Sequence, residues 1–98
     1  MTEQRERAAY LDRLEARIRD GVSGIDNLAA RAEHVEAETK LEFRKHINEL
    51  RARGTAARAR LEALREAPAE SWDDARIAAA RSVDELEGAV QEALERYP

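Results

Sequence analysis

The chain has 98 residues and carries 17 lysines and arginines against 21 aspartates and glutamates, for a formal net charge of −4. This length accommodates one domain at most, and the absence of cysteine excludes disulfide frameworks and thiolate metal sites. Charged residues make up 39% of the chain, against roughly 25% in an average globular domain. The composition predicts long helices. It predicts neither strands nor a membrane span, because no window alternates apolar and polar residues and no apolar run approaches about 18 residues.

Apolar residues recur in steps of three and four from residue 11 to residue 64, which predicts one long amphipathic helix over about residues 2–66. Consecutive steps of four occur twice, at 14-18-22 and at 35-39-43-47, and such stutters locally unwind a left-handed supercoil. The repeat comprises Leu11, Leu14, Ile18, Val22, Ile25, Leu28, Ala32, Val35, Thr39, Phe43, Ile47, Leu50, Gly54, Ala57, Leu61 and Leu64.

Gly21 and Gly24 mark the one place where this helix could break. Gly21 could cap a first helix, and Ser23 with Asp26 three residues later could start a second. Alternatively, the helix continues and tolerates both glycines at roughly 1 kcal/mol each. The apolar repeat crosses the site without losing phase, which favours continuity, and both interpretations stay open.

A turn is predicted at residues 67–70, because Pro68 cannot continue a helix and its ring pushes the preceding residue out of the α region. Ser71 is the expected N-cap of the next helix, with Asp74 in the third position of a capping box. The apolar repeat then predicts a helix over residues 71–97. Trp72, the only tryptophan, is expected to anchor this end by packing, and the alternative is a contact point for a partner protein.

Charge predicts how the last two segments pair. Residues 41–66 hold seven basic and four acidic residues, whereas residues 67–98 hold three basic and eight acidic ones. A short turn joins them, so they should lie antiparallel. With residues 47, 54 and 61 at heptad position a, four arginines occupy successive e positions and should face the acidic last helix. These arginines are Arg44, Arg51, Arg58 and Arg65. Residues 50, 57 and 64 hold position d, and Arg53 and Arg60 hold position g on the other edge of the apolar seam.

The predicted fold class is all-α: a long amphipathic helix with an antiparallel C-terminal helix, forming one coiled-coil domain over residues 1–98. At 1.5 Å per residue the last helix reaches about 40 Å and an unbroken 2–66 helix almost 100 Å, so part of the long helix would stay uncovered. The chain then either turns near Gly21–Gly24 into a three-helix bundle or pairs with a second chain, and self-association is expected. The uncovered residues would be Leu11, Leu14, Ile18, Ile25, Leu28 and Val35.

Three stretches carry a resemblance to a known family. They are residues 38–53, Ala-Glu-Ser-Trp-Asp-Asp-Ala-Arg at 69–76, and Ile-Asp-Asn-Leu at 25–28. Together they resemble the conserved segments of small bacterial coiled-coil proteins of the stress-response type, over roughly residues 10–95. The resemblance implies a helical fold without enzyme activity in a family that is associated with the stress response and has no established biochemical role.

Four residues have the types and spacing of metal ligands. His34, Glu38, Glu42 and His46 follow each other in steps of four, which places neighbouring pairs within chelating reach on a helix. The row also drifts around the helix, so one ion cannot use all four. A solvated helix face is the favoured interpretation, and a metal site built across a self-associated interface is the alternative.

The predicted function is non-enzymatic: a helical interaction or stress-associated protein that acts through coiled-coil contacts, with no catalytic residue and no cofactor. Its serines and threonines show no base partner in any local pattern, and no Gly-rich phosphate loop is present. The alternatives are a metal-binding helical bundle and an amphipathic membrane-surface binder.

The expected partner is a second copy, forming a dimer, or another protein. Nucleic acid is not favoured, because the chain is acidic and no aromatic residue is interleaved with its arginines. The charged N-terminus lacks the apolar core of a secretory signal, and together with the absence of thiols this predicts a cytoplasmic protein.

Overall fold

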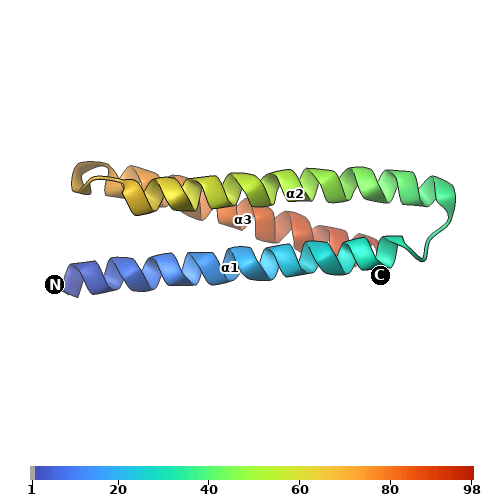
Figure 1. The fold of residues 1–98 in the computed structure, drawn as a ribbon, viewed down its shortest axis with the longest axis horizontal. Coiled ribbons are helices and arrows are strands. Elements are labelled where there is room, and N and C mark those ends of the chain that lie inside the picture. The colour runs from blue at the N-terminus through green and yellow to red at the C-terminus, as the bar shows by residue number, and fades with distance from the viewer. Residues whose placement is uncertain (1) are drawn as a thin grey trace.

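The computed structural model describes residues 2–98 and forms a rod of 55 × 18 × 16 Å (Figure 1). Three helices make up the rod: α1 (Thr2–Ala32), α2 (Ala37–Glu66) and α3 (Trp72–Arg96), with a short 3-10 helix, η1 (Ala69–Ser71), before the last. The three helices contact one another pairwise, and α1 and α3 run parallel to each other and antiparallel to α2. The predicted all-α class is confirmed, in its three-helix form.

The prediction of one helix over residues 2–66 is wrong, and so is the alternative break at Gly21–Gly24. Both glycines lie inside α1, and the chain turns instead at residues 33–36. Two backbone hydrogen bonds, from the amides of Glu33 and His34 to carbonyl groups one turn earlier, close this turn. Nothing in its sequence, Glu-His-Val-Glu, is a strong helix breaker.

The turn coincides with the second stutter in the apolar repeat. Thr39, which the repeat assigns to the core, is exposed, whereas Ala32 before it and Phe43 after it are buried. The two apolar stripes therefore belong to separate helices that face each other. The steps of three and four look continuous along the sequence, but they join two separate repeats here, one in α1 and one in α2.

The turn between α2 and α3 lies where Pro68 predicts it. α2 ends at Glu66, and Pro68 precedes η1, from which α3 continues at Trp72. Ser71 does occupy the position before α3, but its backbone is already in the α region and its side chain makes no capping hydrogen bond. The predicted capping box of Ser71 and Asp74 is therefore wrong. The backbone amide of Ser71, which the Asp74 side chain would pair with in a capping box, already donates to the Pro68 carbonyl at 2.9 Å within the 3-10 turn.

The core runs along the axis of the rod and takes one stripe from each helix. In α2 every residue assigned to heptad positions a and d is buried: Ile47, Leu50, Gly54, Ala57, Leu61 and Leu64. α3 contributes Ala79, Val83, Leu86 and Val90. α1 contributes Leu14, Ile18, Ile25, Leu28 and Ala32.

The fold-back of α1 covers the stripe that an unbroken helix would have left in water. Leu14, Ile18, Ile25 and Leu28 are buried within one chain, and Leu11 and Val35 pack against the same core. A second chain is therefore not needed to cover these side chains.

α1 and α3 pack closely at the two glycines of α1. A Cβ built on Gly24 would lie 2.6 Å from Cγ1 of Val90, and one built on Gly21 would lie 3.0 Å from Cδ2 of Leu86. The glycines thus serve helix packing rather than a turn, since α3 occupies the space that a side chain would need.

Candidate interaction site

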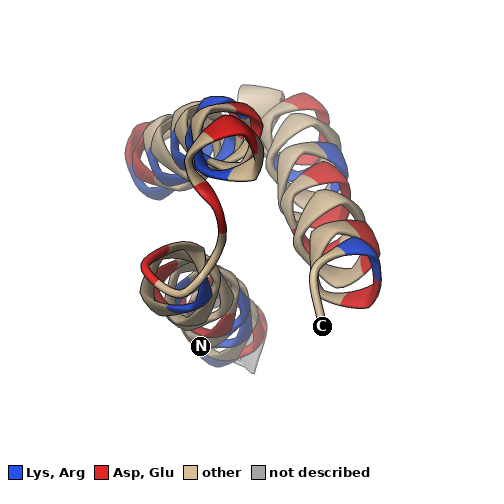
Figure 2. Cartoon of the chain, turned by 90° about the vertical axis from the view of Figure 1, so that its right-hand side faces the viewer, with Lys and Arg blue, Asp and Glu red and all other residues tan. Residues whose placement is uncertain are grey.

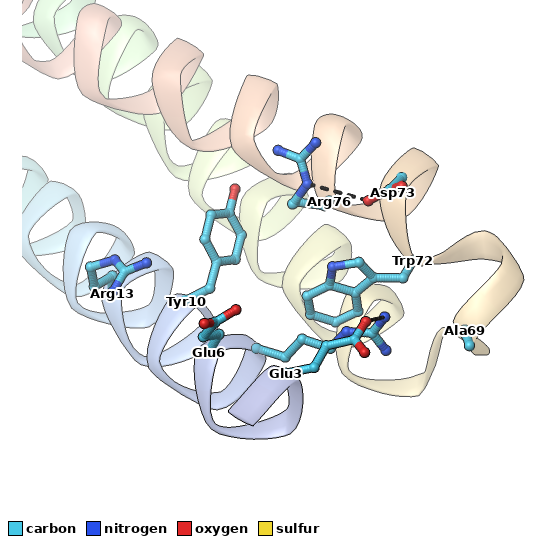
Figure 3. A pocket seen from close by; sticks show the side chains of 9 residues that line it. Glu3, Glu6, Tyr10, Arg13, Ala69, Trp72, Asp73 and Arg76 are labelled. Atoms are coloured by element: carbon cyan, nitrogen blue, oxygen red, sulfur yellow. Dashed lines mark hydrogen bonds and ion pairs between the residues drawn. The ribbon is translucent and has the colours of Figure 1, made fainter. Parts of the chain in front are cut away.

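An open groove of about 370 Å³ lies at the end of the rod where α1 begins and α3 begins (Figure 3). Its aromatic walls are Tyr10 from α1 and Trp72 from α3, and both side chains are half-buried against the core. Trp72 therefore packs at this end of the bundle as expected, while part of its surface also faces the groove.

Two arginines of α1 lie over the aromatic rings of this groove. The guanidinium of Arg7 lies 4.7 Å from the ring centre of Trp72, and that of Arg13 lies 5.8 Å from the ring centre of Tyr10. Arg7 also donates a hydrogen bond to Glu3 Oε1 at 2.8 Å, one turn earlier in α1. These contacts hold flat, amphipathic side chains in a fixed arrangement at the surface.

Charged groups of both signs rim the groove. Arg76 lies 3.8 Å from Asp73 on α3, and Glu3 and Glu6 line the side formed by α1. The rim carries three arginines and three carboxylates, a mixture of both signs of charge rather than the single sign that a phosphate site needs.

Tyr97 closes the opposite end of the rod. Its ring stacks on Phe43 with 4.0 Å between ring centres, and Arg31 Nη1 donates to the Tyr97 carbonyl at 2.8 Å. The Tyr97 hydroxyl is buried and has no hydrogen-bond partner among the described residues. One contact set therefore joins the end of α1, the start of α2 and the end of α3.

Arg17 clamps α1 to α3 between these two ends. Its Nε donates to Glu87 Oε2 at 2.8 Å, and its Nη2 donates to Glu87 Oε1 and to Asp84 Oδ1, the latter at 2.6 Å. The hydrogen bond with Glu87 is the main reason that the pKa of Arg17 rises above its ordinary value, with a further contribution from Asp84 and a partial opposing effect of burial.

The arginine stripe of α2 does not face α3, contrary to the prediction. Arg65 lies 3.1 Å from Glu15, Arg51 lies 3.5 Å from Asp26, and Arg44 lies 3.9 Å from the carboxylate of Glu33. These partners belong to α1 or follow it directly, so the stripe runs along the α1 side of α2. In a two-helix hairpin, residues at heptad position e face the only other helix, which would be α3. In this three-helix bundle, α1 lies beside that edge of α2 instead.

Arg53 is the arginine of α2 that reaches α3, at 4.0 Å from Glu85. It lies on the other side of the helix, in the g position of the predicted seam. The predicted antiparallel pairing of α2 and α3 is thus correct, and so is the position of Arg53 beside α3, whereas the e-position arginines Arg51 and Arg65 pair with α1 instead.

The structure does not bring the four candidate metal ligands together. His34 lies in the turn after α1, Glu38 lies in the first turn of α2, and Glu42 lies 3.9 Å from Arg96. His46 lies 3.7 Å from Glu49 and near the ring of Tyr97. Within residues 2–98, no group of three or more histidine and carboxylate side chains could hold a metal ion.

Sequence reasoning missed the groove because its two aromatic walls lie 62 positions apart in the chain. The signal that could have identified it is Arg7 and Arg13, which flank Tyr10 at helical spacing, but they gain meaning only once α1 is known to lie beside α3.

The described helices contain no segment that is long and apolar enough to cross a membrane. Comparisons with protein families, with curated proteins and with solved structures find no match to this chain.

Proposed function

We propose that this chain is a non-enzymatic interaction module: a prefolded three-helix rod that binds a partner protein at the groove between α1 and α3. The observation that supports this function is the combination of Trp72 and Tyr10, half-buried side by side and each covered by an arginine. Tryptophan, tyrosine and arginine are the residues enriched in the energetic centres of protein interfaces.

The rigid setting of these side chains favours binding. Trp72 and Tyr10 both pack against the core, and Arg7 is held by Glu3, so little conformational entropy remains to be lost when a partner covers them. The charged rim around the aromatic pair supplies hydrogen-bonding groups for orientation.

The two alternative functions find less support. A membrane-surface binder needs a free apolar helix face, and the stripes of all three helices are buried in the core. A metal-binding bundle needs convergent ligands, and the four candidates lie in separate surroundings. A role in the stress response belongs to the proposal through the sequence resemblance alone, and a cytoplasmic location through the absence of cysteine.

The test uses the folded chain as bait in a lysate of its native host. We expect Trp72→Ala and Arg13→Glu to lose captured partners that the wild-type chain retains. Arg81→Glu on the outer side of α3 is the matched control, since this arginine is exposed and remote from the groove, and it should retain them. Circular dichroism of each variant verifies that the helices are intact.

The single tryptophan then allows a direct measurement at the site. Fluorotryptophan places one fluorine label at Trp72, and its NMR signal should shift or broaden when a captured partner is added. Equal capture by all the variants, or a partner that binds without changing this signal, would disprove the groove as the binding site.

A further inference from the structure

The side of α2 that points away from the core forms an open surface, whose residues follow one another in steps of three and four. We call it the outer face of α2. All of its residues are exposed: Leu41, Lys45, Asn48, Ala52, Ala56, Ala59 and Ala63. Leu41 is the most exposed large apolar side chain of the described residues, at 72%. Figure 2, which looks nearly along the rod, shows basic and acidic residues on all three helices around this core.

The flank of this outer face that borders α3 divides into an acidic and a basic half. Glu42 and Glu49 lie in the N-terminal half, and Arg53 and Arg60 lie in the C-terminal half. Their contacts within the chain are long: Glu42 lies 3.9 Å from Arg96, and Arg53 lies 4.0 Å from Glu85. These side chains are exposed and retain the capacity to pair across an interface.

This division is self-complementary under a twofold axis. Glu49 and Arg53 lie equally far on either side of position 51, and so do Glu42 and Arg60. When two copies of α2 lie antiparallel with the axis at position 51, each flank meets its own reverse. Glu49 then faces Arg53 of the other copy, and Glu42 faces Arg60.

The same twofold axis places Leu41 opposite a gap between small side chains on the other copy. The position opposite it on the other copy is 61, and the outer-face residues on either side of that position are Ala59 and Ala63. Two small side chains one turn apart leave a hole into which a leucine of a facing helix inserts. The apolar pairing and the charge pairing therefore require the same alignment.

We propose that two copies of this chain associate back to back through the outer faces of α2, antiparallel about a twofold axis near position 51. The occupant of this face is a second copy rather than another protein, because the charges on the flank beside α3 complement themselves when reversed. On the opposite flank the same axis brings Arg51 toward its own copy and Arg44 toward Arg58, where Asp26 and Glu33 of the same chain offset part of the positive charge. This interface is separate from the groove at Trp72 and does not depend on the function proposed for it.

Charge reversal tests the pairing. The molar mass is measured by multi-angle light scattering from low micromolar to near-millimolar concentration, and the wild-type chain is expected to reach twice the monomer mass. The double variant E42R/E49R makes all four charged positions of the flank beside α3 basic, and the double variant R53E/R60E makes all four acidic. Each alone should weaken association by at least about tenfold, because like charges then face each other.

A mixture of the two double variants supplies the decisive arm. One copy carries a basic flank and the other an acidic one, so the mixture should recover the dimer mass that each variant lost. Failure of the mixture to associate, or variants that associate as well as the wild-type chain, would overturn the alignment. A wild-type mass that stays monomeric throughout, or grows without closing at a dimer, would overturn the proposal.

A second pair of variants keeps the test independent of charge. Leu41→Glu should abolish dimers, whereas Ile77→Glu should leave them unchanged. Ile77 is the other exposed large apolar residue, at 47%, and it lies on α3, away from the outer face of α2. Equal effects of the two substitutions would contradict the interface, and circular dichroism shows that both remain folded.

Discussion

At the scale of single residues, the contact between Gly24 and Val90 limits how closely α1 and α3 pack. The methyl group of an alanine at position 24 would lie 2.6 Å from Cγ1 of Val90, on a stiff branched side chain that cannot simply turn away. Gly88 is also inside a helix, but a Cβ there meets nothing within 4 Å. The two glycines therefore separate the steric effect from helix propensity.

We expect Gly88→Ala to stabilise the chain by about 0.5–1 kcal/mol, because alanine has the better helix propensity. Gly24→Ala gains the same propensity but overpacks the junction, so it should be about 1–3 kcal/mol less stable than Gly88→Ala. Urea unfolding at equal m-values measures both. Equal stability of the two variants would show that the α1–α3 junction is looser than the structure indicates.

The buried hydroxyl of Tyr97 provides a second prediction at this scale. A buried polar group without a partner is costly, and this hydroxyl makes no hydrogen bond to the described residues. Tyr97→Phe keeps the stack on Phe43 and should leave stability unchanged or raise it by up to about 1 kcal/mol. Thermal unfolding measures it, with Tyr10→Phe as the control, and a clear loss of stability would show that the hydroxyl has a partner in solution.

At the scale of the helices, the start of α2 has no side-chain cap. Glu36 occupies the N-cap position with an extended backbone, but its side chain makes no capping hydrogen bond. Aspartate is among the best N-cap residues because its shorter side chain reaches the free amides of the first turn. Glu36→Asp should therefore stabilise the chain by roughly 0.5–1 kcal/mol at unchanged net charge.

Hydrogen exchange locates this effect. The amides of the first turn of α2 should become better protected in Glu36→Asp, while the first turn of α3 stays as it was. Uniform protection changes along the chain, or none, would contradict a local capping effect.

The clamp between α1 and α3 has a defined dependence on pH. Because folding raises the pKa of Arg17, the pairing stabilises the fold at all pH values below the ordinary arginine pKa and is lost only above it. Arg17→Met should cost roughly 1 kcal/mol, because the pair is partly exposed and solvent screens it. Because Arg17 stays protonated, this loss in free energy of unfolding should stay constant from about pH 6 to pH 9 and shrink with added salt.

Arg81→Met serves as the comparison, because Arg81 makes no ion pair with residues 2–98 and its loss should change stability little. Urea unfolding of both variants across the pH range makes the measurement. A cost of Arg17→Met that fades within this range as pH rises would contradict the assigned direction of the pKa shift.

At the scale of the whole molecule, the three helices share one core and should unfold together. Trp72 reports on one end of the rod by fluorescence, and circular dichroism reports on all three helices, so the two melting curves should coincide. Leu28→Ala removes a fully buried side chain and should shift both curves alike, at a cost of about 2–5 kcal/mol.

Leu41→Ala is the matched control for this prediction, since Leu41 is exposed and should change the stability of a single chain by less than about 0.5 kcal/mol. The comparison is made at low protein concentration. Melting curves that separate, with Trp72 released before the helices melt, would show that the groove end unfolds as a unit of its own.

The sequence by itself determined the helical class, the turn at Pro68 and most of the core residues of α1 and α2. These follow from local physics: proline cannot continue a helix, and a stripe repeating in steps of three and four must be buried somewhere. Ile47, Leu50, Leu61 and Leu64 are buried for that reason, whichever helix covers them.

Only the tertiary structure decided where the first helix ends, which neighbour the arginines meet and where the aromatic groove forms. The turn at residues 33–36 has no proline or glycine to mark it, because it is selected by the core that α1 covers after folding back. Arg51 and Arg65 pair with α1 because that helix lies beside their flank, and Tyr10 meets Trp72 only across the bundle. Local sequence specifies which face of a helix is buried, but the identity of its neighbour depends on how all three helices together cover their apolar surface.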